Sequence, residues 1–373
     1  MAKRDNNVYI LGAGFSADAG IPVMAAFLQH AYEAYESPAG ALPFYVEPHY
    51  EAVLRRRIEL KRCRDAVKLD LDNIEQLFGL IDMEESLGHG HRDDISIKHV
   101  IAHLVTHAAT QDISYRVHVE TRALSLASGS AVLNRFCDPM VVARPGRATL
   151  RMKEYELAVA ILAGMFEPDA AGVDNTIVTF NYDVQVENAA ARLDLWPDYG
   201  ISRTRYAGAR TNPGKSLAVR KLHGSSNWAY VRQRATRAHI YDSYDDFGAN
   251  NAPIIVPPTW KKGQFSPLLG EVWAGALKAL SKATRICVIG YSMPETDLHF
   301  QYLMASALAA NPALYGLTVV DIGTLSDRYA KLFVPLVEYG RLKFVGGGLD
   351  GFLTQKQFKR LGRGTGIEEV IRV

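Results

Sequence analysis

An asparagine, an aspartate and a histidine in this chain have side chains that could act together on a sugar. Asn181 and Asp183 follow one apolar, strand-like run, and His223 follows a later one. An asparagine at a strand end can orient a ribose hydroxyl and a water through the two ends of its amide. A histidine, whose unperturbed pKa is near ~6.5, can take a proton from either group at neutral pH. The set favours cleavage of an N-glycosidic bond, with Asn181 and His223 as the catalytic pair and Asp183 in support.

Each of these residues also has a simpler interpretation. An asparagine after a strand is commonly a turn former, and Asp183 can hold the backbone turn rather than support the site electrostatically. The chain has 11 histidines, so the presence of any one of them is weak evidence for a catalytic role. We interpret five others as helix-face or loop residues, namely His89, His91, His99, His103 and His107.

A glycine-rich turn near residue 12 has the form of a dinucleotide-binding site. Gly12, Gly14 and Ala17 fit the pattern G-x-G-x-x-A between an expected strand and an expected helix. Glycines allow the tight turn and let backbone N–H groups approach a pyrophosphate, so Gly12, Ala13, Gly14 and Ser16 are predicted to bind the cofactor. A plain tight turn is the alternative. The acidic residue that a dehydrogenase carries about 20 residues further on is missing, which argues against hydride transfer.

Two later turns follow strand-like runs in the same way. Gly290 and Ser292 come after one run, and Ser292 can bond a ribose or a phosphate. Thr296 or Asp297 can instead cap the helix that follows. Asp321 ends another run and can bond the adenosine ribose. Because ligands of parallel α/β sheets bind at the carboxyl ends of the strands, we expect all these residues to line one crevice.

Alternating strands and helices are expected to position these turns. The pattern predicts an α/β fold with a Rossmann-like, doubly wound parallel sheet. Strands are expected at residues 8–11, 176–180, 254–256, 285–289, 317–320 and 342–345. Helices are expected at 16–29, 184–193, 268–282, 298–309 and 325–338. The segment 195–253, rich in Arg, Tyr, Gly and Asn, is expected to be irregular.

Residues 30–174 have few strand signals and several helical ones. One example is an apolar stripe over 74–81, with Asp72 as the expected cap and Glu75 three residues on. We expect a helical insertion after the first βα unit, dividing a catalytic domain formed by 1–29 and 175–373. The basic run 55–64 is either a solvated helix face or a contact for a partner or a nucleic acid.

Composition limits the remaining possibilities. The chain has 373 residues and a formal net charge of +2, so no global field attracts nucleic acid or an anionic membrane. Its cysteines, Cys63, Cys137 and Cys287, stand singly, so they form no Cys-rich zinc site, and no metal is expected. No signal peptide and no apolar run of ~18 residues is evident, which favours a cytoplasmic location.

Four motifs, in order along the chain, resemble the sirtuin superfamily. They are Gly12-Ala-Gly-Phe-Ser-Ala-Asp-Ala-Gly-Ile-Pro22, Thr179-Phe-Asn-Tyr-Asp183, Leu222-His-Gly224 and Gly290-Tyr-Ser-Met-Pro-Glu-Thr-Asp297. The resemblance covers residues 8–29 and about 175–350. It implies NAD as the substrate and Asn181 and His223 as catalytic residues.

Two departures separate the chain from the protein deacylases of that superfamily. Deacylases carry a four-cysteine zinc module, which three isolated cysteines cannot build. They also continue after the Gly-Ile-Pro motif with Phe-Arg, where this chain has Val23 and Met24. The departures favour similarity to the bacterial, zinc-less antiviral effectors that hydrolyse NAD to nicotinamide and ADP-ribose.

The resemblance also implies partners and leaves alternatives. Bacterial relatives act with a HerA-type ATPase or with a short Argonaute, and we expect a homo-oligomer with a partner of the first kind. Direct nucleic-acid binding and a membrane are not expected. The alternatives are an NAD-dependent protein deacylase and a module that binds NAD or ADP-ribose without turnover.

Overall fold

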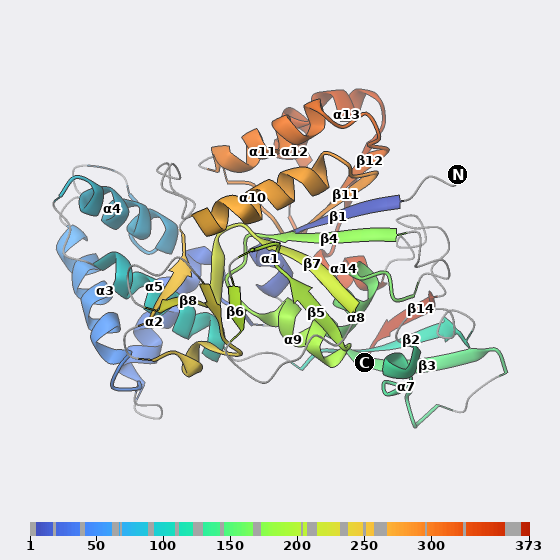
Figure 1. Ribbon diagram of the computed structural model, residues 1–373, viewed down its shortest axis with the longest axis horizontal. Coiled ribbons are helices and arrows are strands. Elements are labelled where there is room, and N and C mark those ends of the chain that lie inside the picture. Colours follow the sequence, from blue (N-terminus) through green and yellow to red (C-terminus); the bar gives the residue numbers. More distant parts are fainter. Residues whose placement is uncertain are drawn as a thin grey trace.

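A parallel sheet of seven strands forms the centre of the computed structural model (Figure 1). Its order is β13-β12-β11-β1-β4-β7-β5, and every neighbouring pair is parallel. The structure describes residues 5–17, 20–37, 42–61, 67, 69–88, 93–108, 112–121, 130–141, 145–166, 173–202, 204–206, 215–231, 238–248, 251–256, 267–294, 297–323, 326–354 and 367–373. His89, His91 and Cys63 lie outside these residues.

The strand register places five strand ends in one row. The strands are β1 (Asp5–Leu11), β4 (Val173–Thr179), β5 (Leu195–Asp198), β7 (Lys215–Lys221), β11 (Arg285–Ile289), β12 (Gly316–Val320) and β13 (Leu342–Val345). Across the sheet, Lys221 pairs with Thr179, Thr179 with Leu11, Leu11 with Ile289, and Ile289 with Val320. All the predicted site residues follow strands in this row.

Helices cover both faces of the sheet, as a doubly wound fold requires. Figure 1 shows one face covered by α10 (Pro267–Leu280), α11 (Leu298–Ala309), α12 (Ser326–Leu332) and α13 (Val334–Glu338). The other face carries α1 (Ala13–Ala17), α8 (Glu154–Leu162), α9 (Gln185–Arg192) and α14 (Gly348–Thr354). The predicted Rossmann-like α/β class is therefore confirmed.

The helical part of the insertion forms its own core beside the sheet domain (Figure 1). This core is formed by α3 (Glu47–Leu60), α4 (Ile74–Ser86) and α5 (Asp93–His107), together with η1 (Met24–Ala26) and α2 (Phe27–Glu36), which begin before the boundary expected at residue 30. Its apolar cluster also takes in Tyr182, Tyr244 and Ile255, so it packs directly against the segment that follows β4. The insertion is thereby held close to the row of strand ends.

Several local expectations were wrong. The helix expected over 16–29 ends at Ala17, and the chain restarts as η1 after Gly20, whose φ of 91° and following Ile-Pro interrupt it. The cap of α4 is Asn73, whose side chain accepts from the Glu75 N–H, while Asp72 accepts from Arg57. Asn73 is the cap because its backbone has the extended conformation that an N-cap needs.

The insertion also contains strands, contrary to a purely helical expectation. A three-stranded sheet joins β2 (Ser114–Glu120), β3 (Arg147–Lys153) and β14 (Ile367–Arg372), and α7 (Ser130–Asn134) lies between the first two along the chain. Strand β2 alternates buried Tyr115, Val117 and Val119 with polar residues, which is the period of a half-buried strand. This part joins the core of the main sheet rather than that of α2–α5.

The described residues of the segment 195–253 form strands, where an irregular segment was expected. Besides β5 and β7, they form a sheet in the order β10-β8-β9-β6, from β6 (Thr204–Tyr206), β8 (Gly224–Val231), β9 (Ala238–Ile240) and β10 (Asn251–Ile255), and η4 (Tyr244–Asp246) lies between β9 and β10 along the chain. The strand expected at 254–256 belongs here, antiparallel to β8, and not to the parallel sheet. No helix among the described residues has the length and hydropathy to span a bilayer.

Candidate active site

A cavity of ≈ 600 Å³ opens at the row of strand ends. Its walls come from the turn after β1, from the segments after β4, β7, β11 and β12, from η1, and from α4 of the insertion. It is lined by Ala13, Gly14, Val23, Met24, Ala25, Asn73, Glu75, Phe180, Asn181, Tyr182, His223, Gly290, Tyr291, Ser292, Pro294, Asp297, Asp321, Ile322 and Gly323. Residues that lie far apart in the sequence thus share one space.

The amide of Asn181 is held in one orientation by the turn after β1. Its Nδ2 donates to the carbonyl of Gly12 and to the hydroxyl oxygen of Ser16, both at 2.9 Å. Because the Gly12 carbonyl can only accept, the nitrogen must face it. Oδ1 accepts no hydrogen bond from the residues that the structure describes, so it can accept one from a ligand or a water.

The backbone around His223 is fixed on both sides. Before it, the N–H of Leu222 donates to Thr179 O at 2.9 Å; after it, Gly224 has a φ of +83°. A Cβ on Gly224 would lie 1.9 Å from the Ile254 carbonyl oxygen, so only glycine fits there. The His223 ring itself is 4% exposed and meets the Phe180 ring edge-on, with centroids 5.1 Å apart.

Two glycine turns interlock at the floor of the cavity. Gly14 donates its N–H to Gly290 O at 2.7 Å, and Gly12 donates to Ile289 O at 3.0 Å. A Cβ on Gly14 would lie 2.9 Å from Gly290 Cα, and one on Gly290 would lie 2.3 Å from Phe15 N. Gly12 and Gly14 therefore allow the close contact between the turn after β1 and the turn after β11. The Gly14 N–H is already hydrogen-bonded within the protein.

Aromatic side chains wall the cavity between these turns. The Phe180 and Tyr291 rings stack with centroids 4.4 Å apart. Burial, followed by the charge of Glu75, raises the pKa of Tyr182 well above its ordinary value; burial and then Asp297 do the same for Tyr291. Both phenols stay protonated, and they donate to Val256 O at 3.1 Å and to Asp297 Oδ2 at 2.7 Å.

Polar residues after β11 and β12 line the cavity, and one of them also caps a helix. Asp297 is the N-cap of α11, and its side chain accepts from Phe300 N at 3.2 Å. The helix cap expected in this turn, as the alternative to ligand binding, is therefore present. Ser292 is exposed at the cavity, and its carbonyl accepts from Arg328 at 2.8 Å. Asp321 also lines the cavity, where its Oδ1 accepts from Gly323 N at 2.8 Å.

Three predicted site residues lie outside the cavity lining. Gly12 and Ser16 sit behind Asn181 and hold it, as described above. Asp183 is buried, and its Oδ1 accepts from Gln185 N at 3.0 Å at the start of α9. This geometry is that of a residue holding a backbone turn.

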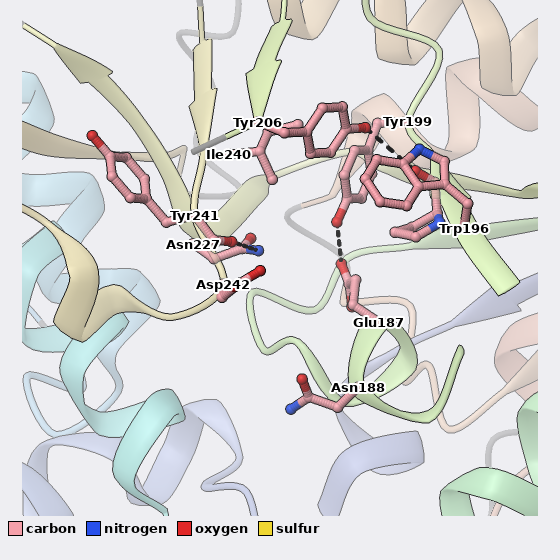
Figure 2. A pocket seen from close by; sticks show the side chains of 10 residues that line it. Glu187, Asn188, Trp196, Tyr199, Tyr206, Asn227, Ile240, Tyr241 and Asp242 are labelled. Carbon is pink, nitrogen blue, oxygen red and sulfur yellow. Dashed lines mark hydrogen bonds between the residues drawn. The ribbon is translucent and has the colours of Figure 1, made fainter. Parts of the chain in front are cut away.

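A second, smaller pocket is lined by residues of α9 and of strands that follow it along the chain. Figure 2 shows it between α9 and the strands β5, β6 and β9, with Trp196, Tyr199 and Tyr206 on one side and Glu187 on the other. Its volume is ≈ 20 Å³, the size of about one water. Asn227, which follows His223 closely in the chain, lines this pocket and not the large cavity.

Sequence reasoning missed the contribution of the insertion to the cavity. Asn73 and Glu75 of the insertion line it, as do Val23 and Met24, which precede the insertion. Glu75 was noted only as the partner of a helix cap, and the helix pattern around it was the one signal available. Among the described residues, no group of three or more His, Cys, Asp or Glu side chains is arranged to hold a metal ion.

The overall fold resembles solved Sir2 structures. One is Sir2 in complex with the inhibitor EX-527, 2′-O-acetyl-ADP-ribose and a deacetylated p53 peptide, at 13% identity and a TM-score of 0.38, covering 96% of this chain and 95% of that one. A Sir2 mutant with a p53 peptide and NAD has 13% identity and a TM-score of 0.37, covering 94% and 91%. A Sir2 homologue mutant with ADP-ribose has 13% and 0.32, covering 89% and 92%. No protein-family model and no curated protein matches the sequence.

Proposed function

We propose that this protein hydrolyses NAD to nicotinamide and ADP-ribose in the large cavity. The observation that carries the proposal is the meeting of Asn181 and His223 in one cavity with both glycine turns. The cavity volume of ≈ 600 Å³ lies within the range of about 300–1,000 Å³ common for ligand pockets. The four sirtuin-like motifs that supply these residues add support from the sequence.

The residues around the cavity have distinct tasks in this reaction. The C1′–N bond of the nicotinamide ribose breaks, its electron pair passes to the nicotinamide nitrogen, and water bonds to C1′. Asn181 Oδ1, with its Nδ2 held by Gly12 and Ser16, orients a ribose hydroxyl or that water. His223 takes the proton released by the water. Phe180 and Tyr291 exclude bulk water around the cationic sugar.

The remaining cavity residues suit the other parts of NAD. Gly14, Ala13 and Gly290 leave room for the pyrophosphate to approach the backbone, and Ser292 can donate to a phosphate or ribose oxygen. The carboxylate of Asp321 can accept from the adenosine ribose hydroxyls. Asp183 and Ser16 support the site from behind. We propose that the reaction needs no metal, because the three cysteines stand singly in the sequence and the part of the chain that the structure describes has no cluster of three or more His, Cys, Asp or Glu side chains.

We infer from the sequence resemblance that the reaction depletes NAD as the toxic step of a bacterial anti-phage response in the cytoplasm. An unregulated NAD hydrolase would kill its own cell, so an inactive state is required. We propose control by self-association together with a partner, of the HerA-type ATPase kind in preference to a short Argonaute. The insertion, including the helix α3 that carries the basic run from residue 55, is the proposed contact surface.

The decisive experiment is nicotinamide release from NAD by the purified protein, alone and with the product of any neighbouring gene. His223→Ala and Asn181→Ala are each expected to reduce turnover by about 10²–10⁴-fold with the fold intact. The matched controls are His30→Ala and Asn134→Ala, at exposed positions on α2 and α7. Near-normal turnover in either site variant would overturn the proposal, and release only in the presence of an acylated peptide would replace hydrolysis by deacylation.

A further inference from the structure

Two adjacent side chains of helix α12 hold the turn that follows β11. Arg328 Nη1 donates to the carbonyl of Ser292 at 2.8 Å and to that of Met293 at 3.1 Å. The hydroxyl of Tyr329 donates to the carbonyl of Tyr291 at 2.7 Å. Three consecutive carbonyls of the turn therefore accept hydrogen bonds from α12, so this helix determines the path of the backbone at the cavity.

The turn needs these bonds because part of its backbone is strained. Met293 has a φ of +48°, in the left-handed region that is unfavourable for a residue with a side chain. Pro294 follows it, and a residue before proline favours an extended backbone instead. Hydrogen bonds from a charged donor are stronger than those from a neutral one. The Arg328 guanidinium is therefore well suited to hold the Ser292 and Met293 carbonyls in place.

The same turn presents side chains to the cavity. Tyr291, Ser292 and Pro294 line it, and Ser292 is exposed there. The Tyr291 ring is fixed by its stack on Phe180, with centroids 4.4 Å apart. The Ser292 hydroxyl makes no hydrogen bond to the residues that the structure describes, so no side-chain contact of this kind directs it. Its direction depends on the backbone that Arg328 holds.

Arg328 also brings a positive charge to this wall of the cavity. The described lining contains three carboxylates, those of Glu75, Asp297 and Asp321, but no Lys or Arg. Within the part of the chain that the structure describes, Arg328 forms no ion pair, so no carboxylate neutralises its guanidinium. A cation bound to the Ser292 carbonyl favours an anionic ligand group beside Ser292.

We propose that Arg328 is a positioning residue of this site, which directs the Ser292 hydroxyl toward the ADP-ribose part of NAD by holding the Ser292 and Met293 carbonyls. This inference rests on the proposed NAD hydrolysis. The ADP-ribose part is common to NAD and ADP-ribose, so Arg328 acts on the binding of both. It takes no part in breaking the C1′–N bond.

The test compares Arg328→Met with Lys331→Met, which removes a cation at an exposed position of the same helix. Arg328→Lys keeps the charge but not the planar fork of donors. Binding of NAD and ADP-ribose is measured by calorimetry in the His223→Ala background, where NAD is not consumed. KM and kcat for nicotinamide release are measured in the otherwise native chain, and thermal unfolding shows whether each variant is folded.

We expect Arg328→Met to weaken the binding of NAD and of ADP-ribose equally, by about tenfold, which is the order expected for a lost charge-assisted hydrogen bond. KM should rise by a similar factor while kcat changes less than about twofold, because the lost interaction serves binding alone. Arg328→Lys should recover part of the affinity, since an ammonium group can also donate to the carbonyls. Lys331→Met should match the native chain. Unchanged affinity in Arg328→Met, or a lower kcat at unchanged KM, overturns the proposal.

A double-mutant cycle with Ser292→Ala tests whether Arg328 acts through Ser292. In the Ser292→Ala background, Arg328→Met should weaken ADP-ribose binding by less than about threefold, because the hydroxyl that Arg328 positions is already absent. The full tenfold loss in that background would mean that Arg328 acts without Ser292, and the positioning role would be wrong. If Arg328→Met does not fold, Arg328→Lys takes its place in the same cycle.

The outcomes separate this inference from the proposed function. If the native chain releases nicotinamide and Arg328→Met does so with the same KM, the role of Arg328 is wrong and the hydrolase stands. If the native chain releases none, yet Arg328→Met loses ADP-ribose affinity through Ser292, hydrolysis is wrong and the positioning role stands. A native chain that binds neither NAD nor ADP-ribose overturns both.

Discussion

Lys221 and Glu187 form an ion pair that is almost entirely buried, with side chains 1% and 5% exposed and an Nζ–Oε1 distance of 3.0 Å. Lys221 Nζ also donates to the carbonyl of Asp183. Lys221 lies two residues before His223, and Asp183 lies two residues after Asn181. One ammonium group therefore ties together the two segments that carry the catalytic pair.

Replacing one member of this pair should be costly. Lys221→Met leaves the Glu187 carboxylate buried without its cation, and we expect the free energy of unfolding to fall by about 3–5 kcal/mol. The double variant Lys221→Met/Glu187→Leu should recover most of this loss, because matched apolar residues remove both charges. Urea unfolding measures both values. A single variant as stable as the native chain would show that the pair contributes nothing.

Gly290→Ala should damage stability and NAD binding together. Its Cβ would lie 2.3 Å from Phe15 N, at a φ of +61° that costs about 1–2 kcal/mol for a residue with a side chain. The control is Gly270→Ala in α10, where a Cβ meets nothing within 4 Å and helix propensity should raise stability slightly. Thermal unfolding and calorimetry provide the readouts, and a normal Gly290→Ala protein would contradict the interlocked turns.

Gly14→Val should weaken NAD binding for a reason different from the one the sequence suggests. The motif alone predicts that the new side chain occupies the space of the pyrophosphate. In the structure, a Cβ at this position already lies 2.9 Å from both Cα and O of Gly290. We therefore expect lower unfolding free energy as well as weaker binding; weaker binding at unchanged stability would favour the motif-based reason.

Acid should destabilise the insertion through two histidines on α5, the half-buried His99 and the buried His103. Burial, with His49 and Lys98 adding, lowers the pKa of His99 to about 3; burial and His107 lower that of His103 to about 4. Both values lie below the ordinary ~6.5, so the unfolded chain binds more protons between these limits and stability falls as the pH drops below about 6.5. At pH 5 the loss is on the order of 2 kcal/mol per histidine.

The pH dependence can be assigned by substitution. His103→Gln should flatten the decline between pH 7 and 5 by about one proton's contribution, whereas His30→Gln, at an exposed site, should leave the curve unchanged. Urea unfolding across this range is the measurement. Identical slopes in His103→Gln and the native chain would mean that His103 is not responsible.

A chelator should leave NAD cleavage unchanged. The three cysteines stand singly in the sequence, so the four-thiolate zinc site of protein deacylases cannot form. Elemental analysis of the purified protein together with turnover after chelation checks this. A stoichiometric transition metal, or activity lost on chelation and restored by metal, would contradict it.

Turnover should depend on assembly. Size analysis by light scattering, combined with NAD cleavage over a range of protein concentrations, should show an oligomer whose specific activity changes with concentration or with the partner chain. Substituting Arg55, exposed on α3, by Glu should alter assembly if the insertion is the contact surface. A monomer that is fully active at every concentration would contradict the proposed control.

The positions of the site residues were predictable because they obey a rule of sheet geometry. Strands such as 285–289 and the helix 298–309 show clear apolar patterns and occur in the structure with those bounds. Once the strands are parallel, their carboxyl ends must share an edge, so Asn181 and Asp321 meet although 140 residues separate them.

Features that depend on distant partners could not be read from local patterns. Strand β7 has lysines at both ends and an arginine within it, and its buried Lys221 is explained only by Glu187. Strand β14 pairs with β2 across more of the chain than any local signal spans. The entry of Glu75 into the cavity likewise depends on how α4 packs, because its spacing along the helix only indicates an amphipathic element.

The central place of β1 has a consequence for how the chain is made. Its edges pair with residues 173–179 and 285–289, so β1 leaves the ribosome well before either of its partner strands is synthesised. At about 5–20 residues per second, the wait for β11 lasts on the order of tens of seconds. Until then β1 is an apolar, β-prone segment with both edges unpaired, and unpaired strand edges favour aggregation. Soluble yield should therefore respond to growth temperature and chaperone supply more than to codon choice near the catalytic motifs.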